Sequence, residues 1–367
     1  MNIRPLIIHL RRLDWTLIIC ASLLVIMGIV SIYSSSISKK DFLNFKKQII
    51  FSVFGVLLML AVSFLDWRFL REDPYIVFVF YFICLVLLVS LFVFAPTIRG
   101  ARAWYKVGPI SLDPIEPTKL ILIILLAKYF STKHIEMYRI IPILVSGFYV
   151  FLPSFLIFLQ PDLGSVLVLA GLWVGILIVS GIKLRHFMAL VLCGILILVF
   201  SWSSVLKDYQ KERIMNFVRP QISDSLKVGW SQSQAKIAIG SGGIWGQGIT
   251  KGSQTQYGFL PEPQTDFIFA AIAEEMGLAG IGIMLSLFFI LIRRILKIAF
   301  DNKSNFPRLF AAGFAVLLLS QIFIHIGMNI GILPIIGIPL PLVSYGGSGL
   351  MTVFTGLGVL QSVKISG

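Results

Sequence analysis

The acidic residue in the most unusual setting is Asp266, in the segment FLPEPQTDFIFAAIAEEMG, where a polar loop meets an apolar stretch. A carboxylate at that depth is costly, because the lipid boundary solvates charge poorly. Thr265 is placed to cap a helix starting there, which would put Asp266 in its first turn, where the helix dipole favours the ionised form. Asp266 is therefore interpreted either as a helix-dipole carboxylate or as a general base at the membrane surface.

A second pair of charges stands in the segment SLDPIEPTKLILI, where Glu116 and Lys119 are three residues apart. This spacing places both side chains on one helix face. The two residues either form a semi-buried ion pair, or Lys119 holds a phosphate and Glu116 positions it. Asp162, in the segment QPDLGS, lies at a tight turn whose Pro, Asp and Gly are explained by turn chemistry alone.

Two further segments have compositions that suit a binding site. The run RGARAW, from Arg99 to Trp104, puts guanidinium groups beside an aromatic ring. That pairing suits sugars and phosphates, and equally an interfacial anchor. The run GIPLPLVSYGGSG, residues 337–349, breaks helix at membrane depth with Pro and Gly. Such backbone is tolerated only when it is buried in protein or lines a wet cavity, so we predict a cavity wall there.

The elements that must position these residues are apolar helices. The chain has 367 residues, of which 57% are hydrophobic and only 13% charged, and the apolar residues come in blocks long enough to span a membrane. This pattern predicts an all-α polytopic integral membrane protein with a single domain over residues 1–367. Ten spans are predicted: 15–34, 46–65, 75–95, 117–131, 140–159, 163–181, 186–204, 266–292, 308–331 and 340–362.

A long extracytoplasmic loop, about residues 205–265, separates the seventh and eighth spans. Its aromatic and aliphatic residues, such as Trp245 and Phe259, are poor choices for a disordered tail. We therefore expect short helices in the interface, one of them near 231–239. Further along the chain, Glu274 and Glu275 follow Asp266 by about two turns, and either is a possible buried ion-pair partner for Arg294 or His325.

Charge distribution predicts the orientation. With the N-terminus inside, the inner loops carry roughly twice as many Lys and Arg residues as the short outer loops, and ten spans return the C-terminus to the inside. This bias explains most of the net charge of +14, while the outer cations suit an anionic partner such as a phosphate head group. Nucleic acid is not expected as a partner, because no basic stripe lies on a soluble domain. Cys20, Cys84 and Cys193 all fall inside spans, with no disulfide or metal spacing. No cleaved signal peptide is predicted.

Several of these segments also resemble the signatures of the SEDS family (RodA/FtsW/SpoVE). The similarity rests on QPDLGS, GSGGIWGQG, FLPEPQTDFIFAAIAEEMG and GILPIIGIPLPLVSYGGSG, together with RGARAW and DPIEPTK. It covers most of the chain from the third span onward, and GSQTQYGFLPE is closer to the RodA branch than to the division branch. The resemblance implies a peptidoglycan glycosyltransferase of cell elongation that polymerises lipid II at the outer face of the bacterial cytoplasmic membrane. It also implies a class B penicillin-binding protein, a transpeptidase, as partner.

The resemblance further implies that Asp266 is the essential acid. The candidate substrate-binding residues are Arg102, Trp104, Glu116, Lys119, Asp162, Lys236, Ser344, Tyr345, Gly346 and Gly347, and no metal ligand is assigned. A divalent cation, Mg²⁺ or Mn²⁺, is a possible aid in compensating the leaving pyrophosphate, and no other cofactor is expected. The chain departs from the family pattern at Gln264, Ala103, His325 and Gly349. Two rival functions are a lipid II flippase and a non-catalytic scaffold for a transpeptidase.

Overall fold

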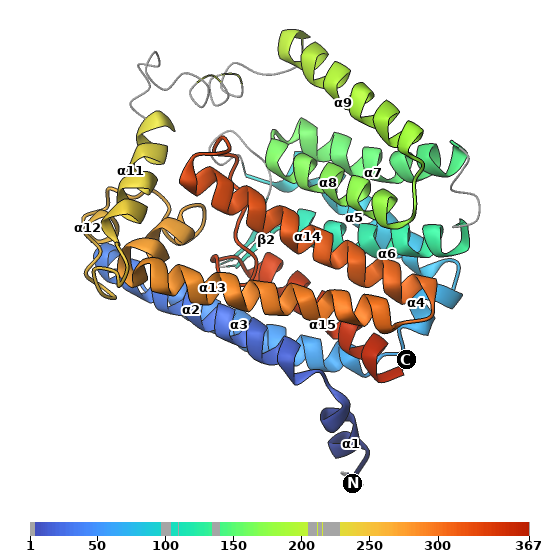
Figure 1. The fold of residues 1–367 in the computed structure, drawn as a ribbon, viewed down its shortest axis with the longest axis horizontal. Helices are drawn as coiled ribbons and strands as arrows, with labels where there is room; N and C mark the ends of the chain where they lie inside the picture. Colours follow the sequence, from blue (N-terminus) through green and yellow to red (C-terminus); the bar gives the residue numbers. More distant parts are fainter. Residues whose placement is uncertain are drawn as a thin grey trace.

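The structure is a computed structural model that describes residues 4–96, 104–108, 110–133, 140–204, 211, 215 and 228–366. It is a bundle of long helices with one short hairpin (Figure 1). The first helices are α1 (Arg4–Arg12), α2 (Trp15–Lys39), α3 (Leu43–Ser63), α4 (Arg68–Glu72) and α5 (Ile76–Phe94). The antiparallel strands β1 (Tyr105–Val107) and β2 (Ile110–Leu112) follow, with Tyr105 opposite Leu112. The remaining helices are α6 (Ile115–Lys133), α7 (Ile141–Leu159), α8 (Leu163–Val179), α9 (Leu184–Ser204), α11 (Val228–Ser241), α12 (Ser253–Gln256), α13 (Ile268–Asp301), α14 (Asn305–Ile330) and α15 (Gly347–Ser366).

Each of the ten predicted spans contains a helix, which confirms the all-α class. Among the described residues, seven helices are long and apolar enough to cross a membrane: α2, α3, α5, α7, α13, α14 and α15. The other three predicted spans, at α6, α8 and α9, stay predictions. Helix α6 carries several charges, among them Glu116 and Lys119, and α8 has only 17 residues. Several boundaries differ from the prediction: α15 begins at Gly347 rather than 340, and α13 begins at Ile268, after Asp266, and ends at Asp301 rather than 292.

Close helix packing joins segments that are far apart in the sequence. Helix α15 packs along α3, and α13 packs against both α2 and α14. Near the two termini, Asp14 is buried and its carboxylate lies 2.5 Å from Nε of Arg294 and 3.0 Å from Nζ of Lys364. The ends of α2, α13 and α15 are thereby held together, so both termini lie at one end of the bundle (Figure 1).

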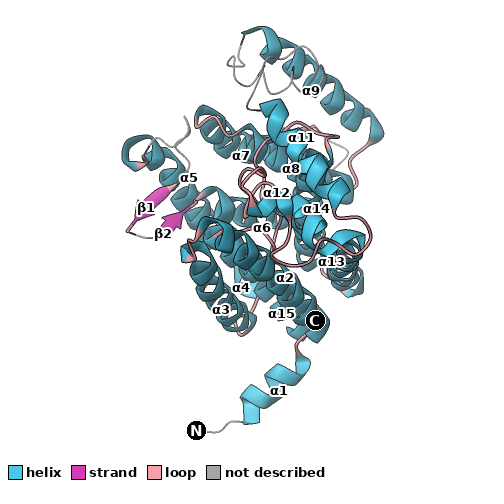
Figure 2. Cartoon of the chain, turned by 90° about the vertical axis from the view of Figure 1, so that its left-hand side faces the viewer, coloured by secondary structure: helices cyan, strands magenta, loops and turns pink. Residues whose placement is uncertain are grey.

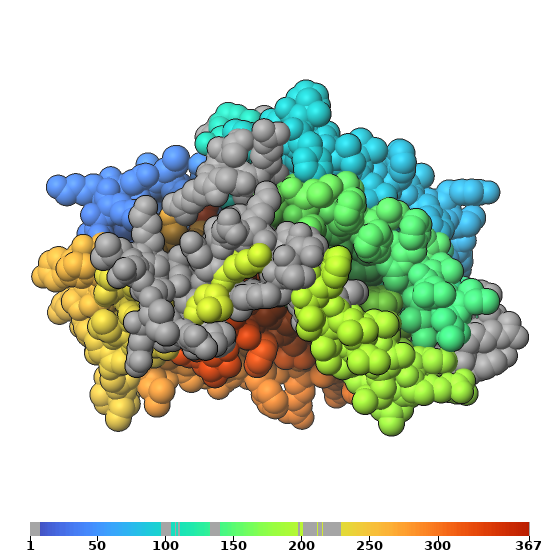
Figure 3. Space-filling view, turned by 90° about the horizontal axis from the view of Figure 1, so that it is seen from above, coloured from blue at the N-terminus to red at the C-terminus, as the bar shows by residue number. Residues whose placement is uncertain are grey.

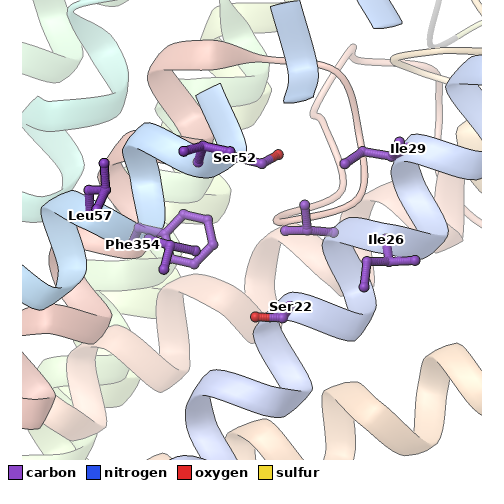
Figure 4. A pocket seen from close by; sticks show the side chains of 9 residues that line it. Ser22, Ile26, Ile29, Ser52, Leu57 and Phe354 are labelled. Carbon is purple, nitrogen blue, oxygen red and sulfur yellow. The ribbon is translucent and has the colours of Figure 1, made fainter. Parts of the chain in front are cut away.

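Helix α9 stands at the edge of the molecule, apart from the main bundle, and much of its apolar surface is exposed (Figure 3). A groove of about 320 Å³ lies between α2, α3 and α15, and Phe354 forms part of its wall (Figure 4). Its lining is almost wholly apolar, apart from Ser22 and Ser52, and it contains none of the candidate site residues. We therefore place the candidate chemistry elsewhere, at the end of the bundle opposite the termini.

A break in α13 shapes that opposite end. Gly277 has φ 64° and ψ −165°, so the helix is interrupted there. The preceding loop fills the break with four backbone hydrogen bonds. Gln247 and Gly248 donate to the carbonyls of Glu274 and Glu275, at 2.9 and 3.0 Å; Leu278 and Ala279 donate to those of Gly243 and Ile244, at 2.9 and 3.0 Å. The described part of the loop thus folds onto α13, and α11 and α12 confirm the expectation of short helices within it.

The predicted ion pairs of Glu274 and Glu275 were wrong. The Glu274 carboxylate accepts the backbone N–H groups of Gln254, at 2.6 Å, and Thr255, at 3.0 Å, at the start of α12. Glu275 accepts the Ser34 hydroxyl of α2. Arg294 pairs with Asp14 instead. Helical spacing alone suggested the wrong partners, because the break at Gly277 brings the loop, rather than another charged side chain, to these two carboxylates.

We predict that Gly277→Ala destabilises the protein. A Cβ at this positive φ would collide with the backbone of Ile244 and Gly246, and such strain costs about 1–3 kcal/mol. Thermal unfolding in detergent should show the loss, and limited proteolysis should cut the 243–256 loop faster. The matched control is Gly282→Ala, also in α13, where an added Cβ meets open space. Equal stability of the two variants would contradict this role for Gly277.

Candidate active site

Asp266 lies in a tight turn, not in the first turn of a helix. Thr265 N–H and Phe267 N–H both donate to the carbonyl of Glu262, at 3.2 and 3.3 Å, and α13 begins only at Ile268. The predicted Thr265 cap is absent, since the N-cap position is Phe267 and it makes no side-chain cap. Asp266 itself is partly exposed. Asp266 therefore directly precedes the N-cap of α13, at the helix end that favours negative charge, and both the helix-dipole and the general-base interpretations stay predictions.

The turn is held against the segment between α14 and α15. The Ser344 hydroxyl donates to the carbonyl of Thr265, at 2.8 Å, and accepts the Leu340 N–H, at 2.9 Å. Tyr345 N–H donates to the carbonyl of Gln264, at 2.8 Å. The non-helical run 337–346 is therefore packed against the Asp266 turn. These bonds give Ser344 a structural role beside the substrate-binding role predicted for it.

Asn329 and Gly337 lie next to Asp266. The amide of Asn329, near the end of α14, donates to the backbone carbonyl of Asp266 at 2.9 Å. Gly337 has φ 75°, and a Cβ placed there would lie 3.7 Å from Oδ2 of Asp266. Gly337 therefore lies directly beside the Asp266 carboxylate. Asn329 holds the turn through the backbone and does not depend on the Asp266 side chain.

Buried amides anchor the same region to α2 and α3. Gln264 is one of the residues at which the chain departs from the family pattern. It accepts a hydrogen bond from the Asn44 amide at 2.8 Å and donates one to the Ser36 hydroxyl at 3.3 Å. Gln48, buried in α3, donates to the carbonyl of Ser344 at 3.3 Å and accepts the Gly346 N–H at 3.4 Å. Sequence reasoning missed Gln48 and Asn329, although polar residues inside apolar spans are a recognisable signal.

The Glu116–Lys119 ion pair is present. Nζ of Lys119 lies 2.6 Å from Oε1 of Glu116, and only 1% of the Lys119 side chain is exposed. Glu116 lies against the start of α15, where a Cβ on Gly349 would be 3.7 Å from its carboxyl carbon. Asp113 N–H donates to the Ser348 hydroxyl at 2.9 Å. The Glu116 carboxylate therefore lies beside the N-terminal end of α15, which favours negative charge.

The run 344–349 thus connects both halves of the candidate site. Its first residues bind the Asp266 turn, and its last residues contact Asp113 and Glu116. Six residues span at most about 20 Å, so the acid and the ion pair lie within reach of one large substrate. Figure 2, which faces this end of the bundle, shows the loops gathered at the centre of the ring of helices.

Asp113 carries an unusual charge state. Desolvation and the nearby Glu116 carboxylate raise its pKa to about 8, against the opposing effect of Lys119. Because the folded pKa lies above the unfolded one, the folded protein holds this proton more tightly. The stabilisation that comes from this tighter proton binding is complete below about pH 4 and is lost as the pH rises through about 8. Near neutral pH, the proton held by Asp113 keeps this residue from adding a full negative charge beside Glu116.

We predict that Asp113→Asn flattens the pH dependence of stability. The wild type should lose more thermal stability between pH 6 and pH 9, roughly the window across the raised pKa, than the variant does. Unfolding of both proteins in the same detergent, followed across that pH range, checks this. Parallel curves for the two proteins would show that Asp113 does not titrate there.

The other predicted site residues have separate positions. Asp162 caps α8 by accepting the Ser165 N–H at 3.0 Å, as turn chemistry predicts, and its charge also acts on Asp113. Lys236, exposed on α11, lies over Gly331 at the end of α14. Trp104 is exposed just before β1. Gly347 packs against the ring of Phe51, where a Cβ would approach to 2.7 Å. Arg102 and Ala103 lie outside the described residues.

The described residues offer no group of three or more His, Cys, Asp or Glu side chains that would hold a metal ion. Side chains of this part of the chain therefore do not by themselves form a complete ligand shell for the suggested Mg²⁺ or Mn²⁺. Such ions commonly take one or two carboxylates and complete their shell with water and substrate phosphates. Side chains of the protein alone are sufficient for the general-base step considered for Asp266.

The family model for FtsW, RodA and SpoVE, described as cell cycle protein, matches residues 14–366. The chain belongs to this family. Peptidoglycan glycosyltransferase MrdB of Escherichia coli (strain K12) is 35% identical over 360 residues, which cover 96% of this chain and 93% of the relative. Stage V sporulation protein E of Bacillus subtilis (strain 168) is 34% identical over 365 residues, 96% of each chain. The resemblance inferred from the motifs is confirmed.

Solved structures of the FtsW/RodA/SpoVE family share the fold. One chain of a peptidoglycan synthase complex, described as coordinating polymerization and crosslinking, matches with a TM-score of 0.82 at 30% identity and covers 96% of this chain and 97% of that one. The crystal structure of Thermus thermophilus rod shape determining protein RodA matches with a TM-score of 0.70 at 28% identity, over 96% of each chain. With its apolar helices, the chain is a polytopic membrane protein.

Proposed function

We propose that this protein is a peptidoglycan glycosyltransferase that polymerises lipid II at the outer face of the bacterial cytoplasmic membrane. The observation that carries the proposal is a partly exposed acid, Asp266, in a turn packed against the 344–349 run, which also contacts Glu116 of the Glu116–Lys119 pair. The names of the FtsW/RodA/SpoVE relatives, among them the glycosyltransferase MrdB, support it. The cation bias supports an orientation with the end that carries the two termini inside and the Asp266 end outside.

In the proposed reaction, the 4-hydroxyl oxygen of one lipid-linked disaccharide attacks the anomeric carbon of another. The new C–O bond forms as the bond to polyprenyl pyrophosphate breaks, and Asp266 takes the hydroxyl proton as general base. A single displacement inverts the anomeric carbon. Pyrophosphate is a good leaving group and needs no acid partner, unlike the leaving alcohol of the two-carboxylate hydrolases.

The leaving pyrophosphate needs positive charge nearby, and Lys119 is a candidate to supply it. The Lys119 ammonium group is buried and paired with Glu116. We therefore propose that Lys119 acts on the pyrophosphate at a distance, and that direct contact requires the pair to open when substrate binds. Arg102 of the RGARAW run is the second candidate cation. The transpeptidase partner is proposed from the peptidoglycan synthase complex that this chain resembles.

A flippase would place charged groups along a continuous path across the membrane. Among the described residues, the charges at the inner end, Asp14, Arg294 and Lys364, are closed into one cluster by ion pairs. The partly exposed Asp266 lies at the other end, which favours an enzyme. A scaffold role leaves Asp266 and its surroundings without a purpose.

The test is to incubate the purified protein with lipid II, with and without the transpeptidase partner, and to separate the glycan strands by size. We expect strands of several disaccharides, digestible by a muramidase. Translocation of labelled lipid II in vesicles without polymer would identify a flippase. Absence of both activities, together with binding of the partner, would identify a scaffold.

A further inference from the structure

The turn formed by residues 243–249, which fills the break in α13, has the properties of a membrane-inserted element. Its backbone polar groups are well satisfied. Gly246 N–H donates to Gly242 at 2.8 Å, and the turn exchanges four further backbone bonds with α13 around Gly277. Backbone in lipid is tolerated only when its polar groups have such partners, so this turn meets the requirement that most loops fail.

Apart from Gln247, which accepts the Ser253 N–H, the side chains of the turn are apolar and exposed. Trp245 is 83% exposed and Ile244 is 63% exposed. Leu278, which bonds to the turn through its backbone N–H, is 64% exposed on α13 and is followed along that helix by other exposed apolar side chains. The exposed surface of the turn therefore continues the lipid-facing surface of a membrane-spanning helix.

The depth of the turn follows from two contacts between α2 and α13. The Asp14–Arg294 pair joins the helices near one end, and the Ser34–Glu275 hydrogen bond joins them near the other. The distance along either helix is roughly 19–20 residues, or about 30 Å at 1.5 Å per residue. That is the thickness of the hydrocarbon core. Glu275, and the turn beside it, therefore lies level with the outer boundary of that core.

We propose that residues 243–249 insert into the outer leaflet and that their partner is lipid at the boundary of head groups and acyl chains. Trp245 and Ile244 lie among the lipids, where amphipathic aromatic rings are favoured. Lys251, which is exposed and bonds through its N–H to Gly248 at 3.0 Å, is placed to reach lipid phosphates. The insertion holds the loop that leads to the Asp266 turn at the membrane surface. It does not depend on the proposed glycosyltransferase activity.

The test measures the depth of residue 245. Trp245→Cys, in a background with Cys20, Cys84 and Cys193 changed to Ala, is labelled with a nitroxide and reconstituted in phosphatidylcholine–phosphatidylglycerol vesicles. The control is Tyr257→Cys, because Tyr257 is 77% exposed and follows Gln256, whose carbonyl accepts from Ser38, one turn further out than Ser34. We expect the ratio of oxygen to nickel-chelate accessibility to be several-fold higher at 245 than at 257.

Equal accessibility to the nickel chelate at both positions would overturn the proposal, and would favour a water-exposed surface that awaits a protein partner. A second measurement keeps the native cysteines in case the background fails to fold. Brominated lipids should quench the tryptophan emission of the wild type more than that of Trp245→Phe. The difference between the two emission spectra, which comes from Trp245, should be strongly quenched by these lipids. An unquenched difference spectrum would also overturn insertion.

Discussion

Asp266→Asn abolishes glycan polymerisation and leaves the protein folded. Removing a general base costs about 10²–10⁴-fold in rate, and an amide does not take up the hydroxyl proton. The fold should survive, because Asn329 binds the backbone carbonyl of residue 266 and Ser344 binds that of Thr265. Strand synthesis from lipid II by the purified variant, in the presence of the partner, measures the effect.

The matched control is Asp41→Asn, an exposed acid at the same end of the bundle. Its Oδ1 accepts the Leu43 N–H, and the side-chain oxygen of asparagine can accept the same hydrogen bond. The control should polymerise lipid II at close to the wild-type rate, and both variants should unfold at nearly the wild-type temperature. Glycan strands made by purified Asp266→Asn at the wild-type rate would remove Asp266 from the mechanism and leave the family assignment in place.

The second large effect concerns the ion pair. Lys119→Met leaves the Glu116 carboxylate without its cation in a buried position, and breaking a buried pair in this way costs about 3–5 kcal/mol. We expect a marked fall in thermal stability in detergent. The double variant Glu116→Gln/Lys119→Met removes both charges and should recover most of the stability.

The double variant also separates structure from chemistry. If Lys119 supplies charge compensation to the pyrophosphate, the recovered fold should still polymerise lipid II slowly, with the loss in kcat rather than in KM. Full activity in the stable double variant would show that the pair serves only to hold α6 at the start of α15. A double variant as unstable as Lys119→Met would contradict the uncompensated charge as the cause.

Much of the helical architecture could be predicted from the sequence, because hydrophobic periodicity and length are local properties. The Glu116–Lys119 pair was predictable for the same reason, since helical geometry places residues three apart on one face. The place of Asp266 at the edge of an apolar stretch followed directly from the sequence. Its separation from the helix did not, because bonds from Ser344 and Tyr345, far along the chain, hold it in a turn.

The sequence by itself determined the membrane class, the predicted spans, the family and the acid on which the proposed chemistry rests. Tertiary structure alone decided which segments meet: Gln48 with the 344–346 run, Asn329 with the Asp266 turn, and the 243–248 loop with the break at Gly277. Each of these contacts joins residues distant in sequence through buried polar groups. Such groups must find partners within the protein, and which partners are near depends on how the helices pack.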